Sequence, residues 1–83
     1  MTADRPDAQR VRQRVAAQVR RLRGARDLTQ EAAAGRAGLA VRHFRKIEAG
    51  EVNVTLDTLV KVAVALGVDV AELLQWPTGG MEG

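Results

Sequence analysis

The sequence predicts an all-α fold of five helices, and three observations lead to this prediction. Apolar residues recur at helical spacing through most of the chain, no segment alternates as a strand does, and helix start and stop signals separate the periodic stretches. The 83 residues suffice for one domain with a single small core. We expect this domain to span residues 8–76, between flexible tails at 1–7 and 77–83.

The composition argues against several classes of protein. The chain has no cysteine, which excludes disulfides and thiolate metal sites. It also has no apolar run near the roughly 20 residues that cross a bilayer, and no signal-peptide core. We therefore expect a cytoplasmic protein with no membrane partner. The only histidine, His43, has neither a second metal ligand nor a nucleophile placed beside it, so we expect no cofactor and no enzymatic activity.

The net charge of +3 conceals an uneven distribution. Residues 1–46 carry 12 Arg and Lys against four acidic residues, a net charge of +8, whereas residues 47–83 carry one lysine against six acidic residues, a net charge of −5. A basic half beside an acidic half favours a polyanionic partner on one side of the molecule. The alternative is an ordinary solvated surface in an arginine-rich protein.

The first helix is expected to end near Ala25. Pro6 suits its first position, and Asp7 suits its first turn, where a negative charge is favourable. Asp27, just beyond the helix, is expected to adopt the left-handed conformation that glycine usually takes there. The apolar positions of this helix are Ala8, Val11, Val15, Val19 and Leu22.

Two short helices follow. Thr29 is expected to cap the second helix and Gly38 to end it, and the third helix should run from Val41 to Ala49 with Phe44 and Ile47 facing inward. Two short helices joined by a turn of three or four residues that contains glycine form the helix-turn-helix pattern. The second helix of such a pair can enter the DNA major groove.

Two further helices complete the prediction. Thr55 should cap the fourth helix, and Gly67 should end it. Asp69 with Glu72 resembles a capping box at the start of a fifth helix, from Val70 to about Gln75. The apolar stripe expected on the fourth helix consists of Leu56, Leu59, Val60, Ala63 and Leu66.

Taken together, these motifs resemble the lambda-repressor-like, Xre/Cro family of helix-turn-helix DNA-binding domains over about residues 15–75. The chain departs from the family at Ala33, where the family usually has Leu, and at Val54, where it usually has Pro. The resemblance is carried by Thr29-Gln30, Ala34, Ala37-Gly38, Ile47 to Gly50, Thr55 to Leu59 and Ala65 to Val68. It implies a sequence-specific regulator of transcription, a repressor that places residues 41–49 in the major groove of double-stranded DNA.

The base-contacting residues are expected on the polar side of the third helix. Arginine can bind guanine O6 and N7 with two hydrogen bonds, and an apolar side chain such as Val41 can touch a thymine methyl group. The resemblance implies that Gln30, at the start of the second helix, either contacts a phosphate or supports the third helix, and that Asn53 contacts the DNA backbone. The predicted DNA-binding residues are Thr29, Gln30, Val41, Arg42, His43, Arg45, Lys46 and Asn53. The alternatives are a solvated helix surface, a plain first-turn role for Gln30 and a turn-forming role for Asn53.

The resemblance also implies a structural ion pair between Arg23 and Glu48, which would fix the angle of the third helix. A homodimer on a pseudo-palindromic operator is expected, since domains of this kind usually bind in that way. Its candidate interface consists of Val64, Val68, Val70, Leu74 and Trp76, although Trp76 could instead cover the core. The competing hypothesis is an antitoxin or an adaptor, whose main partner is another protein.

Overall fold

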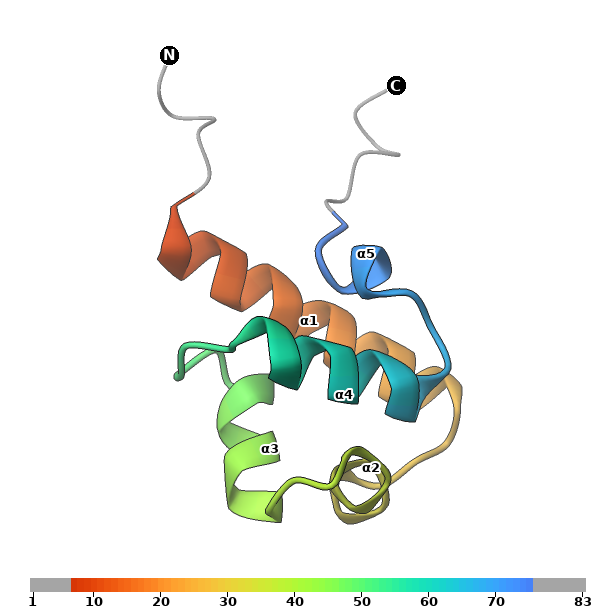
Figure 1. Ribbon diagram of the computed structural model, residues 1–83. Coiled ribbons are helices and arrows are strands. Elements are labelled where there is room, and N and C mark those ends of the chain that lie inside the picture. The colour runs from red at the N-terminus through yellow and green to blue at the C-terminus, as the bar shows by residue number, and fades with distance from the viewer. Residues whose placement is uncertain (1–6, 76–83) are drawn as a thin grey trace.

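The computed structural model describes residues 7–75, which fold into five α-helices without a strand (Figure 1). The predicted all-α, five-helix fold is confirmed. Apart from Asp7, the expected tails at 1–7 and 77–83 lie outside the described residues, as does the candidate interface residue Trp76. The helices are α1 (Ala8–Ala25), α2 (Gln30–Ala37), α3 (Val41–Glu48), α4 (Leu56–Leu66) and α5 (Val70–Leu73).

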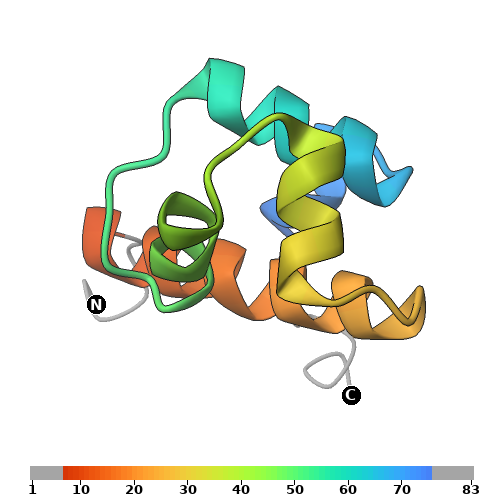
Figure 2. The same ribbon diagram turned by 90° about the horizontal axis from the view of Figure 1, so that it is seen from below.

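The two short helices α2 and α3 lie on one side of the two longer helices. In Figure 1 they lie below α1 and α4, and in Figure 2, seen from that side, α1 and α4 appear behind them at opposite edges of the view. The contacts agree with this view, since α2 packs on α4 and on α3, and α3 packs on α1. The short α5 contacts both α1 and α4.

Most of the predicted helix ends are confirmed. The Thr29 hydroxyl accepts a hydrogen bond from the Ala32 N–H at 3.0 Å, so it satisfies a free donor of the first turn of α2. Gly38 follows α2 with a φ of 72°, which a residue with a side chain rarely adopts. In the same way, the Thr55 hydroxyl caps the start of α4, and Gly67 ends the helix in the left-handed conformation. Asp27 has a φ of 54°, the left-handed conformation expected for it.

Other helix ends differ from the predictions. Asp7 lies at the N-cap of α1 and not in its first turn, because its carboxylate accepts the free Arg10 N–H at 2.8 Å. The helix α3 ends at Glu48, with Ala49 as its C-cap. Asp69 occupies the N-cap of α5 but its side chain caps nothing, and the helix ends at Leu73. The expected capping box is therefore absent.

The core draws side chains from all five helices. Ala33 and Ala34 are fully buried, and their small side chains let α2 approach its neighbours closely. The largest fully buried side chains are Phe44, Ile47, Leu66, Leu73, Val19 and Val62.

The prediction for the buried face of α4 was partly wrong. Leu59, Ala63 and Leu66 are buried as expected, but Leu56 is 75% exposed and Val60 is 50% exposed. Val64 is 73% exposed and follows them at the same four-residue spacing. These three side chains therefore form an exposed apolar strip on α4, which we call the α4 strip. Because α4 is apolar almost all round, its sequence did not show which face would be buried.

A buried glutamine that the sequence analysis did not single out connects α5 to α1. Gln18 is only 3% exposed, and its amide nitrogen donates to the Glu72 carbonyl at 2.6 Å. Its side-chain oxygen accepts from Arg14 Nη2 at 3.1 Å and from Arg21 Nε at 3.2 Å. A buried polar group needs such partners, because leaving it unsatisfied is costly.

Candidate nucleic-acid interface

The turn between α2 and α3 fixes how the two helices meet. The Leu39 N–H donates to the Ala34 carbonyl at 2.9 Å, and the Gly38 N–H donates to the Gly35 carbonyl at 3.2 Å. These bonds satisfy carbonyl groups at the end of α2 that would otherwise lack partners. Leu39 also packs against the core. The chain is thus held on both sides of the turn, and α3 begins only two residues later.

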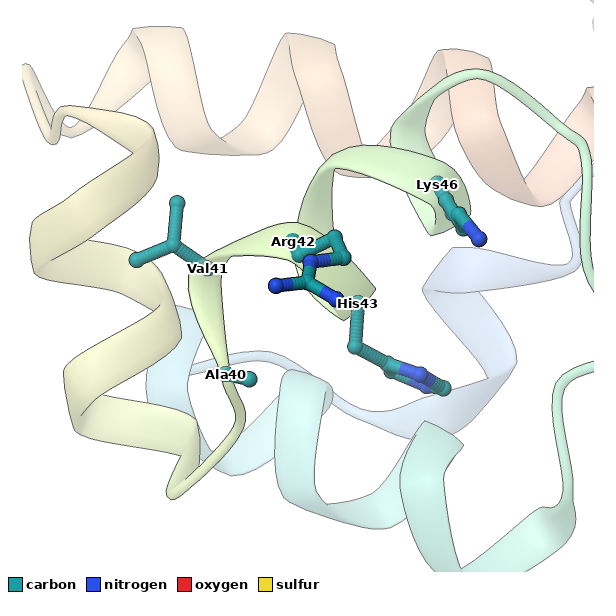
Figure 3. Close-up of a pocket in the computed structure, with 5 residues that line it drawn as sticks. All are labelled: Ala40, Val41, Arg42, His43 and Lys46. Atoms are coloured by element: carbon teal, nitrogen blue, oxygen red, sulfur yellow. The ribbon is translucent and has the colours of Figure 1, made fainter.

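The two sides of α3 have different environments. Phe44 and Ile47 are at most 1% exposed, and they hold α3 against the rest of the domain. An open hollow lies along the other side, and Figure 3 shows the residues that line it. These are Ala40, Val41, Arg42, His43 and Lys46. The structure therefore brings four of the predicted DNA-binding residues together on one face.

The ion pair expected between Arg23 and Glu48 is present, with Glu48 buried and the Arg23 side chain 21% exposed. Arg23 Nε lies 2.6 Å from Glu48 Oε2, and Arg23 Nη2 lies 3.1 Å from Glu48 Oε1. Arg23 also donates to the Leu28 carbonyl at 2.8 Å, and Arg20 donates to the Glu48 carbonyl. The hydrogen bond to Glu48 raises the pKa of the Arg23 guanidinium above its ordinary value. The stabilisation from this charge is lost only at pH values above the ordinary pKa of arginine, so it persists at physiological pH.

Gln30 extends this network from α1 and α3 to α2. Its amide nitrogen donates to Glu48 Oε1 at 2.8 Å, and its side-chain oxygen accepts from Arg45 Nε at 3.2 Å. The side chain of Gln30 thus lies against α3 and connects Glu48 to Arg45. This position suits a residue that supports the third helix, one of the two roles that the family resemblance implies for it.

Arg45 is placed differently from the other basic residues of α3. Its Nη2 lies 3.0 Å from Glu31 Oε2, so its guanidinium reaches α2 and not the hollow. Both side chains of this pair are exposed, at 54% and 63%. An exposed ion pair contributes about 0–1 kcal/mol, whereas a good base contact contributes roughly 1–3 kcal/mol. The pair with Glu31 is therefore too weak to prevent Arg45 from binding DNA.

The last two predicted DNA-binding residues lie outside α3. The Thr29 hydroxyl is engaged in capping α2. Asn53 is exposed in the loop between α3 and α4, where its side-chain oxygen accepts from Arg12 Nη1 at 2.9 Å. Arg12 was not among the residues predicted from the sequence, because nothing local indicates a contact between residues 41 positions apart.

The candidate interface residues for a dimer have mixed exposure. Val64 and Leu74 are exposed, whereas Val68 and Val70 are partly buried against the core. The part of the chain that the structure describes holds no group of three or more His, Cys, Asp or Glu residues that could bind a metal ion. No helix between residues 7 and 75 is long and apolar enough to cross a membrane.

Comparison with known proteins agrees with this geometry. A family model for a helix-turn-helix domain matches residues 14–76. An uncharacterized HTH-type transcriptional regulator of Sinorhizobium fredii is 38% identical over 64 residues, which cover 77% of this chain and 83% of the relative.

Solved structures with the same fold include two regulators. The restriction-modification controller protein C.AhdI of Aeromonas hydrophila has a TM-score of 0.73 and 34% identity, over 75% of this chain and 94% of that one. The hypothetical transcription factor NHTF of Neisseria has a TM-score of 0.82 and 31% identity, over 93% of this chain and 88% of that one. The fold is thus that of a lambda-repressor-like domain. The chain belongs to the helix-turn-helix family, whose matched members here are transcriptional regulators.

Proposed function

We propose that this protein is a sequence-specific regulator of transcription, a repressor that places α3 in the major groove of double-stranded DNA. The observation that carries the proposal is the uncovered face of α3. Arg42 and Lys46 line its hollow, and neither forms an ion pair within residues 7–75, whereas Arg23 and Arg45 both do. Positive side chains without a carboxylate partner, on a helix held from behind by a packed face, suit contact with DNA.

The residues of the interface have distinct roles in this proposal. Arg42 and Lys46 donate to base edges, Val41 packs against a thymine methyl group, and His43 lies at the rim of the face. Thr29 and Gln30 hold the start of α2, whose backbone N–H groups suit a phosphate. Asn53 contacts the DNA backbone. Arg45 breaks its ion pair with Glu31 and contacts DNA when the protein binds.

Selection from genomic fragments tests this proposal. The purified protein should enrich particular duplexes, and its affinity for them should fall steeply between about 50 and about 200 mM salt, because each neutralised phosphate releases a counterion. A scrambled duplex of the same length is the control and should bind more weakly. If the protein shows no salt-sensitive binding to any DNA, the proposal fails and the antitoxin or adaptor hypothesis, with a protein as the main partner, takes its place.

We further propose that the protein binds a pseudo-palindromic operator as a homodimer. The α4 strip supports this, because Leu56, Val60 and Val64 are exposed apolar side chains at four-residue spacing, and Leu74 of the candidate interface is exposed as well. The wider candidate interface also includes Val68, Val70 and Trp76. Exposed Asp57 and Lys61 follow the α4 strip at the same four-residue spacing. Two α4 helices packed antiparallel about Val60 would thus place opposite charges near each other, which favours a second copy as the partner.

A further inference from the structure

A bridge between two distant segments lies outside the face of α3. Arg12, in the second turn of α1, donates from Nη1 to Asn53 Oδ1 at 2.9 Å and from Nη2 to Gln9 Oε1 at 3.1 Å. We propose that Arg12 shares the contact with the DNA backbone that is assigned to Asn53 above, so that the two side chains together bind one phosphate beside the bases that α3 contacts. This inference rests on the proposed DNA-binding function. It goes beyond that function because Arg12 precedes residue 14, where the match to the helix-turn-helix family begins.

The hydrogen-bond chemistry of the pair favours an anion. An asparagine side chain has one acceptor oxygen and an amino group with two donors. Arg12 occupies the oxygen of Asn53, so the amino group is left to donate on the other side of the amide. Arginine has only donors, and both partners of Arg12 are neutral side chains. The pair therefore offers donors and a positive charge to an incoming group, and a phosphate oxygen matches both.

The backbone holds the two side chains together. Gly50 lies so close to α1 that a Cβ atom there would be 3.5 Å from Cγ of Gln13 and 3.8 Å from Cβ of Ala16. Its φ of 72° also favours glycine, so the loop from α3 turns directly onto α1. Asn53 follows three residues later. The path of the loop thus brings Asn53 close to Arg12.

The position of the site suits a phosphate that flanks the bases. The loop between α3 and α4 runs beside the first turns of α1 (Figure 2), and it leaves from the end of α3 that carries Lys46 (Figure 3). The Arg12–Asn53 pair is not part of α3, the helix that would enter the major groove. The pair would therefore contact the sugar-phosphate backbone beside the groove and not the base edges. Contacts of this kind fix how a protein sits on the duplex and carry no sequence information directly.

The sharpest test is Asn53→Asp, because it keeps the acceptor for Arg12 and replaces the outward donors with a negative charge that repels phosphate. Arg12→Ala removes the guanidinium. Arg26→Ala is the control, since Arg26 follows the opposite end of α1 and donates to the Leu22 carbonyl. Each variant is measured by fluorescence anisotropy on a duplex that the wild-type protein recovers from genomic fragments, and on a scrambled duplex of equal length.

We expect Arg12→Ala and Asn53→Asp to lower the affinity for both duplexes by about five- to tenfold at about 0.1 M salt, which corresponds to one lost phosphate contact. The slope of log affinity against log salt should fall by about 0.9 in Arg12→Ala. The ratio of affinities for the two duplexes should stay constant, and Arg26→Ala should match the wild type.

Other results separate the possible failures. If the pair only holds the loop in place, Asn53→Asp will bind both duplexes and melt as the wild type does, and the phosphate site is overturned. Wild-type affinity in Arg12→Ala overturns it as well. If the wild-type protein binds neither duplex, the proposed function fails first. A thermal melt of each variant by circular dichroism identifies any loss of binding that comes from unfolding.

Discussion

At the scale of single residues, one carboxylate organises the candidate interface. Glu48 is 3% exposed, and it accepts from Arg23 on α1 and from Gln30 on α2. It therefore connects α3 to both helices that support it. A buried ion pair adds little net stability, because desolvation offsets the attraction, but removing one partner leaves a costly unpaired charge. The position of α3 thus depends on keeping both partners.

A double-mutant cycle on Arg23→Ala and Glu48→Ala tests this dependence. Arg23→Ala should lower the free energy of unfolding by about 3–5 kcal/mol, because Glu48 stays buried without its charged partner. Glu48→Ala should cost less, because the Arg23 side chain is 21% exposed and water can reach it. The double variant should recover part of that loss, with a coupling of about 0.5–3 kcal/mol in urea denaturation. A coupling near zero would mean that the contact does not hold α3 in place.

Gln30→Ala should weaken DNA binding across all sequences. The substitution removes the hydrogen bonds to Glu48 and Arg45, so α3 is held less firmly while its base-contacting residues remain. Affinities for a set of duplexes with single base changes should fall by a common factor. Gln30→Glu serves as a second variant, because it keeps the shape but places a carboxylate against Glu48. A change of base preference in Gln30→Ala would assign Gln30 a direct contact with bases.

At the scale of helices, local chemistry explains which predictions succeeded. The ends at Thr29, Gly38 and Gly67 follow from the residue type at one position, so the sequence was sufficient to predict them. The buried face of α4 depends on which neighbours cover it, and a helix that is apolar almost all round gives no local signal. The inward-facing side of α3, by contrast, could be predicted, because that helix has one apolar and one polar side.

The contacts of exposed arginines were beyond prediction from the sequence. Arg45 lies on the polar side of α3, as expected, but the rotamer that carries its guanidinium to Glu31 depends on the packing of α2 against α3. The contact from Arg12 to Asn53 requires the loop after Gly50 to turn onto α1. Such contacts join residues that are distant in sequence, and their energies are small, so no periodicity or motif indicates them.

The helix α2 offers a test of backbone conformation at two glycines. Gly35 lies inside the helix, and a Cβ atom added there would have no neighbouring atom within 4 Å, so Gly35→Ala should raise the free energy of unfolding by about 0.5–1 kcal/mol. Gly38 has equal space but a φ of 72°, so Gly38→Ala should lower it by a similar amount or more. Urea denaturation measures both. If the two variants shift stability in the same direction, the assigned helix end is wrong.

At the scale of the whole molecule, the charge division predicted from the sequence has a structural counterpart. The basic half, residues 1–46, contributes α1, α2 and most of α3, with the residues that line the hollow and with Arg12, whereas Asn53, α4 and α5 come from the acidic half. The two halves thus suit different partners. One favours a polyanion, and the α4 strip favours a second apolar surface.

Sedimentation tests the dimer that we propose on the α4 strip. The wild-type protein should sediment as a dimer at tens of micromolar, and Val60→Asp should convert it to a monomer, because a charge at the centre of an apolar contact is costly to bury. Lys61→Ala, which removes only a charge at the edge of the proposed contact and leaves the strip apolar, is expected to weaken the dimer far less. A wild-type monomer at that concentration would defeat the stable dimer and leave the α4 strip to another protein.

The most direct test of the central proposal is the base preference of Arg42→Ala. If α3 contacts bases through its uncovered face, this variant should fold normally but lose discrimination at particular base pairs, by about 1–3 kcal/mol at each, in a competition assay against single base changes. Binding to scrambled DNA should weaken far less. If Arg42→Ala instead loses affinity by the same factor for every duplex, Arg42 contacts only the DNA backbone, and the assignment of α3 as the base-contacting helix is contradicted.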